Sequence, residues 1–279
     1  MDLVGRVDAN TEWKDFNQIK NLFLENSMFE VFPDISSFSK LETLLISYGS
    51  FKEIKPICSC KLLKNIYLTN GSIKKLPEPI CTFQNLRVLI LSNNKLNKLP
   101  DKIGKLSKLK KLYLNSNFLT SLPDMSSMAE LEELFLSENV FSEFPIQVCS
   151  IYTLKQLKLD NNSIKSIPEE INKLAELNLL SITNNKIENI PHCIGDLSKL
   201  ANLHLDNNDI QNLPISILSI PNLIEISVSQ NPSISQFCDY NEIIDYLKNS
   251  KEETQKITTI KLIILGTAGD YFIYLLCFI

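Results

Sequence analysis

The stretch LRVLILSNNKLNKLPDKIGKLSK, residues 86–108, recurs along this chain in several variants. Close copies are LKQLKLDNNSIKSIPEEINKLAE, which starts at Leu154, and LANLHLDNNDIQNLPISILSIPN, which starts at Leu200. The common pattern is LxxLxLxxNxLxxLPxxIxxLxx, and we number its positions from the first Leu. A period kept this strictly predicts a solenoid of stacked units. Successive units start 22 or 23 residues apart, at Ile19, Leu41, Leu63, Leu86, Leu109, Leu131, Leu154, Leu177, Leu200 and Leu223.

Each part of the pattern has a physical interpretation. In LxxLxL, alternation places the leucines on one face of a short strand and the intervening residues on the other face. LPxxI is expected to return the chain along the opposite side, with Pro fixing φ and the Ile covering the core. Because one unit cannot bury its apolar face alone, the units are expected to stack into one curved parallel sheet.

The Asn at position 9 can both donate and accept hydrogen bonds. We interpret it as structural, because a side-chain amide at this turn replaces missing backbone partners; the alternative is a polar binding ladder. The first three units carry Ser27, Gly49 and Gly71 instead, and are expected to be less regular. The Asn column is Asn94, Asn117, Asn139, Asn162, Asn185, Asn208 and Asn231.

This pattern resembles the leucine-rich repeat family, and the resemblance covers roughly Ile19 to Gln236. It implies an α/β solenoid of horseshoe shape, with a curved parallel sheet on the concave face and short helical or irregular convex segments. LPxxI-type units without a signal peptide are similar to those of intracellular Ras-associated repeat proteins and of Roco proteins. That similarity implies a non-catalytic scaffold or adaptor in small-GTPase or kinase signalling.

The chain is expected to have four parts. Residues 1–18 are an N-terminal cap, in which TEWKDFNQI is predicted to be a short helix, and residues 19–236 are the repeats. Residues 237–257 are a closing helix, indicated by apolar residues at helical spacing. Residues 258–279 are an apolar tail. The expected helix residues are Thr11, Trp13 and Phe16 in the first cap and Ile243, Ile244 and Leu247 in the second.

Composition narrows the function. The net charge of −4 argues against general nucleic-acid binding, which needs a basic surface. The seven cysteines are scattered and form no CxxC pair, and the first residues contain no apolar run of signal-peptide length. Both features favour a reducing, cytoplasmic compartment.

A partner-binding surface is expected on the concave face. Position 5, the exposed residue in the middle of each strand, is apolar in the first six units and polar in the last four. Adjacent apolar side chains on a surface often mark a partner site, although they can also pack only against one another. Basic residues on the neighbouring column suggest a partner with an apolar patch and an acidic rim. The predicted binding residues are Phe23, Leu45, Tyr67, Ile90, Tyr113 and Phe135, with Lys64, Arg87, Lys110 and Lys111 as the basic margin.

No catalytic, cofactor-binding or metal-binding motif is found in the sequence, and none is predicted. The tail KLIILGTAG resembles the first strand and phosphate loop of a Roco-type GTPase. The loop requires GxxxxGK[ST]. Gly266 matches the first Gly, but Tyr271, Phe272 and Ile273 stand where Gly, Lys and a hydroxyl are needed. This tail is therefore not expected to hydrolyse GTP.

Three alternatives for the tail stay open. In the first alternative, the chain is the recognition half of a truncated Roco-type GTPase. In the second, its reading frame departs from a GTPase sequence after Gly269. The third alternative is a membrane anchor at residues 261–279, which are long enough to span a bilayer. The anchor is disfavoured because Asp270 near the bilayer centre costs about 3 kcal/mol.

Overall fold

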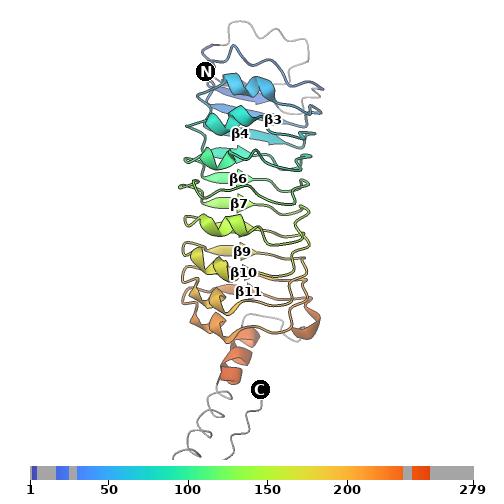
Figure 1. Cartoon of the computed structure of the whole chain (residues 1–279), viewed down its shortest axis with the longest axis vertical. Helices are drawn as coiled ribbons and strands as arrows, with labels where there is room; N and C mark the ends of the chain where they lie inside the picture. The colour runs from blue at the N-terminus through green and yellow to red at the C-terminus, as the bar shows by residue number, and fades with distance from the viewer. Residues whose placement is uncertain (1, 5–16, 25–29, 235–240, 252–279) are drawn as a thin grey trace, which may run out of the picture.

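The computed structural model describes residues 2–4, 17–24, 30–234 and 241–251. These residues form one parallel sheet whose strands follow the chain order, so the predicted solenoid fold is confirmed (Figure 1). Each strand pairs with the strand of the next repeat. The strands are β1 (Asp2–Val4), β2 (Asn21–Leu24), β3 (Thr43–Ser47), β4 (Asn65–Thr69), β5 (Val88–Ile90), β6 (Lys111–Tyr113), β7 (Glu133–Phe135), β8 (Gln156–Lys158), β9 (Leu179–Ser181), β10 (Asn202–His204) and β11 (Glu225–Ser227).

Short 3₁₀ helices, η1 to η7, lie on the side of the solenoid away from the sheet, whereas η8 lies in the turn that follows β11 (Figure 1). Most begin just after a proline, as expected for LPxxI. This side is short and helical because a coil of 22 or 23 residues leaves room for about one turn. The helices are η1 (Lys55–Ser59), η2 (Glu78–Thr82), η3 (Ile103–Lys105), η4 (Ile146–Ser150), η5 (Glu169–Lys173), η6 (His192–Asp196), η7 (Ile215–Ser219) and η8 (Pro232–Ile234).

Two repeats, those that start at Ile19 and Leu109, have no 3₁₀ helix among their described residues. Both carry PDxSS in its place. Asp34 accepts a hydrogen bond from the amide of Ser36 at 3.0 Å, and Asp124 accepts one from Ser126 at 2.9 Å. These backbone hydrogen bonds lower the pKa of both carboxyl groups. The Asp side chain thus forms a tight turn that replaces the helix.

The core is continuous from the first repeat to the last. The Leu side chains of LxxLxL and the Ile of LPxxI are buried, as Leu89, Leu91 and Ile103 show. A helix of residues 241–251 follows the last described coil, and its Ile243 and Leu247 belong to the same core. The four-part division of the chain stays a prediction.

The Asn column confirms the structural interpretation. Asn94 Nδ2 donates to the carbonyls of Leu68 and Leu91 at 2.8 and 3.0 Å, and its Oδ1 accepts from the amide of Ile73 at 3.1 Å. Each later Asn repeats this pattern. Leu68 and Ile73 belong to the preceding coil, so each Asn ties two coils together.

The N-terminal end differs from the expected one. Residues Asp2–Val4 form β1, which pairs in parallel with β2, and the repeat pattern did not predict this strand. Three residues are too few for the 23-residue template to detect. The expected cap helix at Thr11, Trp13 and Phe16 lies outside the described residues, as does Ser27.

Candidate functional site

The apolar column lies on adjacent strands. Parallel pairing places the six position-5 residues from Phe23 to Phe135 next to one another on β2 to β7, because each is the direct partner of the next. All six side chains are half-buried. The same column continues with Lys158 on β8 and Ser181 on β9. The structure therefore brings together the predicted apolar residues in one stripe on the concave face of the sheet, which is the face turned away from the core.

The centre of this stripe is an aromatic stack. The rings of Tyr113 and Phe135 are 4.2 Å apart and nearly parallel, with 9° between their planes. Lys158 Nζ lies 5.0 Å from the centre of the Phe135 ring, which is a cation–π distance. Lys158 was not among the predicted site residues, because it stands on the polar half of the column. We call Tyr113, Phe135 and Lys158 the aromatic cluster.

Glu133 holds the aromatic cluster from one side. Its carboxylate accepts hydrogen bonds from the Tyr113 hydroxyl and from Lys111 Nζ, the latter at 2.8 Å. Desolvation opposes ionisation of Glu133, but hydrogen bonds from Lys111 and Tyr113 outweigh it and lower the pKa of this carboxyl. Desolvation and the bond to Glu133 raise the pKa of Tyr113. The Tyr113 ring is thus held by a charged partner as well as by stacking.

The predicted basic margin is mostly ion-paired. Lys64 contacts Glu42 at 2.6 Å, Lys110 lies 3.9 Å from Glu130, and Lys111 is paired with Glu133. Arg87 has no ion-pair partner among the described residues. Within the described residues, the position-2 column therefore offers one cation without an ion-pair partner, Arg87, which directly precedes β5.

On the polar half of the concave face, carboxylates accept hydrogen bonds from neighbouring coils. Asp160 accepts hydrogen bonds from the Ser137 and Ser181 hydroxyls and from the Thr183 amide, the last at 2.9 Å. Two repeats further on, Asp206 accepts from the Ser227 hydroxyl and from the amide of Ser229 at 2.7 Å. These carboxylates are used in joining neighbouring coils. They leave less free polar surface for a ligand than the sequence suggests.

His204, Ser227 and Asp206 lie together, but their order does not fit nucleophilic catalysis. A serine nucleophile gives its proton to a histidine that a carboxylate orients from the far side. Here the Ser227 hydroxyl donates directly to Asp206, and His204 Nδ1 lies 3.2 Å from the Ser227 oxygen. The same Asp–Ser bond occurs at Asp160 without a histidine. The cluster is therefore a variant of a coil-to-coil contact.

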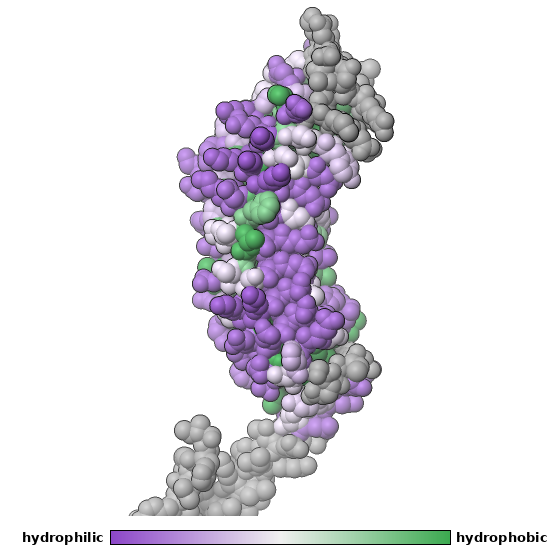
Figure 2. Space-filling view, turned by 90° about the vertical axis from the view of Figure 1, so that its right-hand side faces the viewer, coloured by the Kyte–Doolittle hydropathy of each residue, from purple (hydrophilic) through white to green (hydrophobic). Residues whose placement is uncertain are grey.

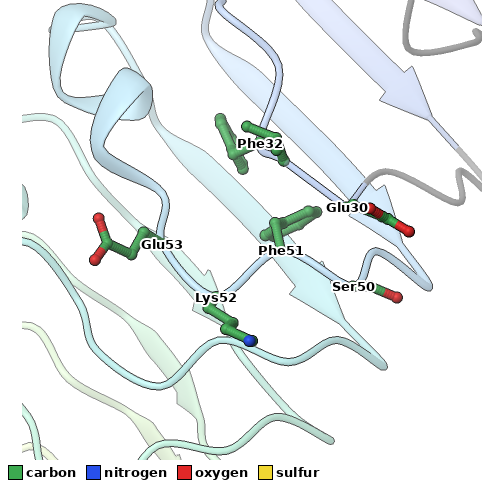
Figure 3. Close-up of a pocket in the computed structure, with 7 residues that line it drawn as sticks. Glu30, Phe32, Ser50, Phe51, Lys52 and Glu53 are labelled. Carbon is green, nitrogen blue, oxygen red and sulfur yellow. The ribbon is translucent and has the colours of Figure 1, made fainter.

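A hollow of about 610 Å³ lies at the N-terminal end of the solenoid. Phe32 and Phe51 line it and meet edge to face, with their ring centres 5.0 Å apart. Figure 3 shows that the charged groups of Glu30, Lys52 and Glu53 point away from one another. A small-molecule site needs converging polar groups, which this hollow does not provide.

A second exposed apolar spot lies where the chain leaves the strands. Phe118 and Val140 occupy position 10 of adjacent repeats and are 53% and 48% exposed. Figure 2 shows that the side onto which the strand ends open is otherwise mainly hydrophilic, with small hydrophobic areas. Two side chains bury too little surface to hold a protein partner alone.

Two other kinds of site are a metal centre and a membrane-spanning helix. Among the described residues, no group of three or more His, Cys, Asp or Glu side chains could hold a metal ion. No helix within the described ranges is long and apolar enough to span a bilayer. The membrane anchor at residues 261–279, a disfavoured alternative for the tail, lies outside those ranges.

The family follows from a direct comparison of the sequence. A family model described as a leucine-rich repeat region matches residues 18–144 and 145–249, which is most of the chain. The chain belongs to the leucine-rich repeat family. Leucine-rich repeat folds are typically non-enzymatic binding scaffolds. No curated protein matches the chain.

Solved leucine-rich repeat structures resemble this one. A leucine-rich repeat protein of Leptospira interrogans is 28% identical, with a TM-score of 0.56, over 82% of this chain and 72% of that one. The ectodomain of the Arabidopsis thaliana receptor kinase GASSHO1/SCHENGEN3, solved with CASPARIAN STRIP INTEGRITY FACTOR 2, is 23% identical with a TM-score of 0.65. The complex PEPR1–AtPEP1 is also 23% identical, with a TM-score of 0.67.

The two receptor structures extend well beyond this chain. The alignments cover 76% and 77% of this leucine-rich repeat protein, but only 27% and 32% of the receptor chains. At 23% identity these likenesses show the fold alone. What those receptors bind is a property of those proteins.

Proposed function

We propose that this leucine-rich repeat protein captures a protein or peptide partner on its concave face, at the aromatic cluster. The cluster carries the proposal because it presents stacked apolar rings and a cation on the same face. Aromatic residues are favoured anchors at interfaces. Solved relatives of the same fold hold protein or peptide ligands, which supports the general class of partner.

The partner should carry an acidic group close to an apolar side chain. Arg87 supplies an unpaired cation two strands away from Phe135, with Ile90 and Tyr113 between them. Lys158 supplies a second cation at the other end of the stack. Because strands in a sheet lie about 4.8 Å apart, these cations are spaced for an extended segment of a few residues.

A signalling role in the cytoplasm belongs to the same proposal. It rests on the LPxxI-type units and on cysteine usage. The five described cysteines, Cys58, Cys60, Cys81, Cys149 and Cys193, are all free thiols. A small GTPase or a kinase-pathway protein is the partner class that the repeat type favours, whereas the acidic balance disfavours nucleic acid.

The test is a selection of random displayed peptides on the full chain. Recovered peptides should combine Asp or Glu with a Leu or aromatic residue. Phe135→Ala should weaken binding of the best peptide by at least about tenfold, because central aromatic anchors dominate interfaces. Arg87→Ala should weaken it by about threefold, and more strongly at low salt.

Tyr152→Ala is the matched control, because Tyr152 is an aromatic residue that is 63% exposed and outside the sheet. It should bind like the parent chain. The double variant Tyr113→Ala/Phe135→Ala should lose binding with only a small decrease in thermal stability. If peptides bind Phe135→Ala as tightly as the parent, the binding site lies elsewhere.

A further inference from the structure

Charge is distributed unevenly along the solenoid. Residues 61–111 contain 12 Lys or Arg residues and two Asp or Glu residues, whereas residues 112–234 contain six and 15. The chain with a net charge of −4 therefore has a strongly basic region, which is centred on the third and fourth repeats. A local field of one sign attracts partners of the opposite charge.

Five exposed lysines gather on one edge of the solenoid, where each coil runs from the end of its strand toward the convex side. They occupy positions 10, 12 and 13 of the repeat, between the buried positions 11 and 14. The Lys74 amide donates to the Lys52 carbonyl at 3.2 Å, and the Lys95 amide donates to the Ile73 carbonyl at 2.9 Å, so these coils lie side by side. None of the five ammonium groups has an ion-pair partner within the described ranges. We call these residues the lysine patch: Lys52, Lys74, Lys75, Lys95 and Lys98.

Exposed apolar side chains lie on the same edge. Phe118 and Val140 occupy position 10 in the two repeats that follow Lys95, and the Phe118 amide donates to the Leu96 carbonyl at 2.8 Å. Tyr48, at position 8 of the second repeat, is 58% exposed. Figure 2 shows small hydrophobic areas surrounded by hydrophilic residues on this side of the molecule. The edge therefore combines cations with apolar side chains.

Tyr48 occupies a backbone position that disfavours aromatic residues. Its φ is 61°, and position 8 is also left-handed in the next eight repeats, where it carries Asn, Ser, Glu or Gln. Bulky residues are uncommon in this conformation, which Asn tolerates better. The Tyr48 ring is exposed, so packing in the core does not compensate for the backbone cost. Contact with a ligand would account for an aromatic residue at this turn.

We propose that this edge binds the surface of an anionic phospholipid bilayer. The lysine patch contacts the headgroups, because lysines close to an anionic leaflet are attracted to it. Phe118, Val140 and Tyr48 enter the interfacial layer, where burial of apolar side chains adds to the electrostatic attraction. The aromatic cluster lies on the sheet rather than on this edge. The inference is therefore independent of the proposed partner site, which stays accessible on a bound molecule.

A bilayer fits this edge better than a nucleic acid or an acidic protein does. The cations of the patch are all lysines, whereas arginines form the bidentate pairs that recognise phosphate or carboxylate groups in fixed positions. Val140 is aliphatic and cannot stack on a base. Figure 1 shows the coils stacked in one column, so Tyr48 and Val140, four repeats apart, are separated by about 19 Å along it. Apolar side chains spread over this length match a broad surface rather than a pocket.

Carboxylates limit the basic part of this edge to the N-terminal half of the solenoid. Glu53, next to Lys52 in the sequence, is paired with Lys55 at 3.4 Å. In the sixth repeat, Glu138 and Glu143 are exposed at positions 8 and 13. We therefore expect the second to fifth repeats to lie closest to the membrane, with the acidic repeats turned away from it.

The experiment is flotation of the full chain with phosphatidylcholine vesicles that contain about 30% phosphatidylserine, compared with vesicles of phosphatidylcholine alone. The chain should bind the anionic vesicles only, and less tightly as the salt concentration rises. Lys74→Glu/Lys95→Glu should lower the partition coefficient at least about 25-fold, because each lysine near an anionic surface contributes about fivefold.

Lys165→Glu/Lys186→Glu is the matched control. Lys165 and Lys186 are exposed and occupy the same positions 12 and 10 on the same edge, but in the seventh and eighth repeats. The control variant has the same net charge as Lys74→Glu/Lys95→Glu, and its partition coefficient should change by less than about threefold. Phe118→Ser should lower vesicle binding about fivefold, because an apolar side chain no longer enters the interface.

Three results would overturn the proposal. Equal vesicle binding by Lys74→Glu/Lys95→Glu and by the parent chain would place the contact elsewhere. Equal binding to neutral and anionic vesicles would assign it to an apolar segment such as residues 261–279 instead of the lysine patch. Binding to double-stranded DNA or to polyglutamate, without binding to anionic vesicles, would show that the edge takes a nucleic acid or an acidic protein.

Discussion

The second and third repeats and the seven that follow share one backbone path, but different groups hold their turns. From Asn94 onward, an Asn that is buried, or half-buried at Asn162, bonds each coil to the coil before it. In the second and third repeats the same position is Gly49 or Gly71. The strands there are longer: β3 and β4 have five residues each, against three in every strand from β5 to β11. Longer strand pairing thus accompanies the loss of the side-chain bonds.

Two phenylalanines show how the turn changes. Phe51 and Phe141 both occupy position 11, and both are buried. The Phe141 amide donates to Asn162 at 3.1 Å, so its coil is part of the Asn ladder. The Phe51 ring instead lies over Gly49, with its Cε1 only 2.0 Å from where a Cβ of residue 49 would be. Glycine at position 9 is therefore required by the ring.

The largest effect is expected from breaking the ladder itself. Asn139→Ala leaves the carbonyls of Leu114 and Leu136 and the amide of Leu119 without their side-chain partner. Each buried unpaired group costs about 1–3 kcal/mol, so the free energy of unfolding should fall by at least about 3 kcal/mol. Urea denaturation measures this. Asn97→Ala is the control at an exposed Asn and should change stability by less than about 0.5 kcal/mol.

A smaller effect is expected when the ladder is introduced where it is missing. Gly49→Asn restores the repeat pattern, but its side chain collides with the Phe51 ring, and we expect a loss of about 1–3 kcal/mol. The double variant Gly49→Asn/Phe51→Leu removes the collision and should recover most of that loss. Denaturation of the four variants gives the coupling energy. Additive effects would contradict the explanation given for Gly49.

The smallest effect concerns the buried thiols, which occur in both regions. Burial raises the pKa of Cys81, in the third repeat, to about 11 and that of Cys149, in the sixth, to about 12, from an ordinary value of 9.0. A raised pKa in the folded state favours folding below pH 9, and this contribution is lost as the pH rises toward 11–12. The urea midpoint should therefore decrease between pH 8 and pH 10.5. Cys149→Ala should show a smaller decrease than the parent chain, and an equal decrease would exclude a role for this thiol.

Much of the fold could be predicted from the sequence because the same pattern recurs in every repeat, so each copy supports the interpretation of the others. Ten copies of one pattern fix the strands, the inward leucines and the Asn turns without reference to another protein. The strand β1 escaped detection because three residues carry no period. The loss of the 3₁₀ helix at Asp34 and Asp124 could have been found, since PDxSS occurs in both of these 22-residue repeats.

The candidate site was predictable only in part. Periodicity places Tyr113 and Phe135 on one face, and the structure adds that their rings stack. Periodicity does not show which charged side chains form ion pairs with one another, because a Lys can reach a carboxylate in its own coil or in the next coil. The pairing of Lys64 with Glu42, and the isolation of Arg87, therefore required coordinates. Lys158 was overlooked because its side chain is charged, although it occupies the same position 5 as the aromatic residues on the strand next to Phe135.

The Asn ladder also determines how this molecule responds to force. Each Asn of the column makes side-chain hydrogen bonds to the coil that precedes it. A force applied at the C-terminal end therefore acts on the hydrogen bonds of one Asn at a time. A detached coil of 23 residues would release about 80 Å of extended chain. Stretched in an optical trap, the seven Asn-bearing coils should yield in steps of similar length. The Asn-bearing coils are therefore expected to resist force about equally, and the repeats on their N-terminal side lack these side-chain hydrogen bonds.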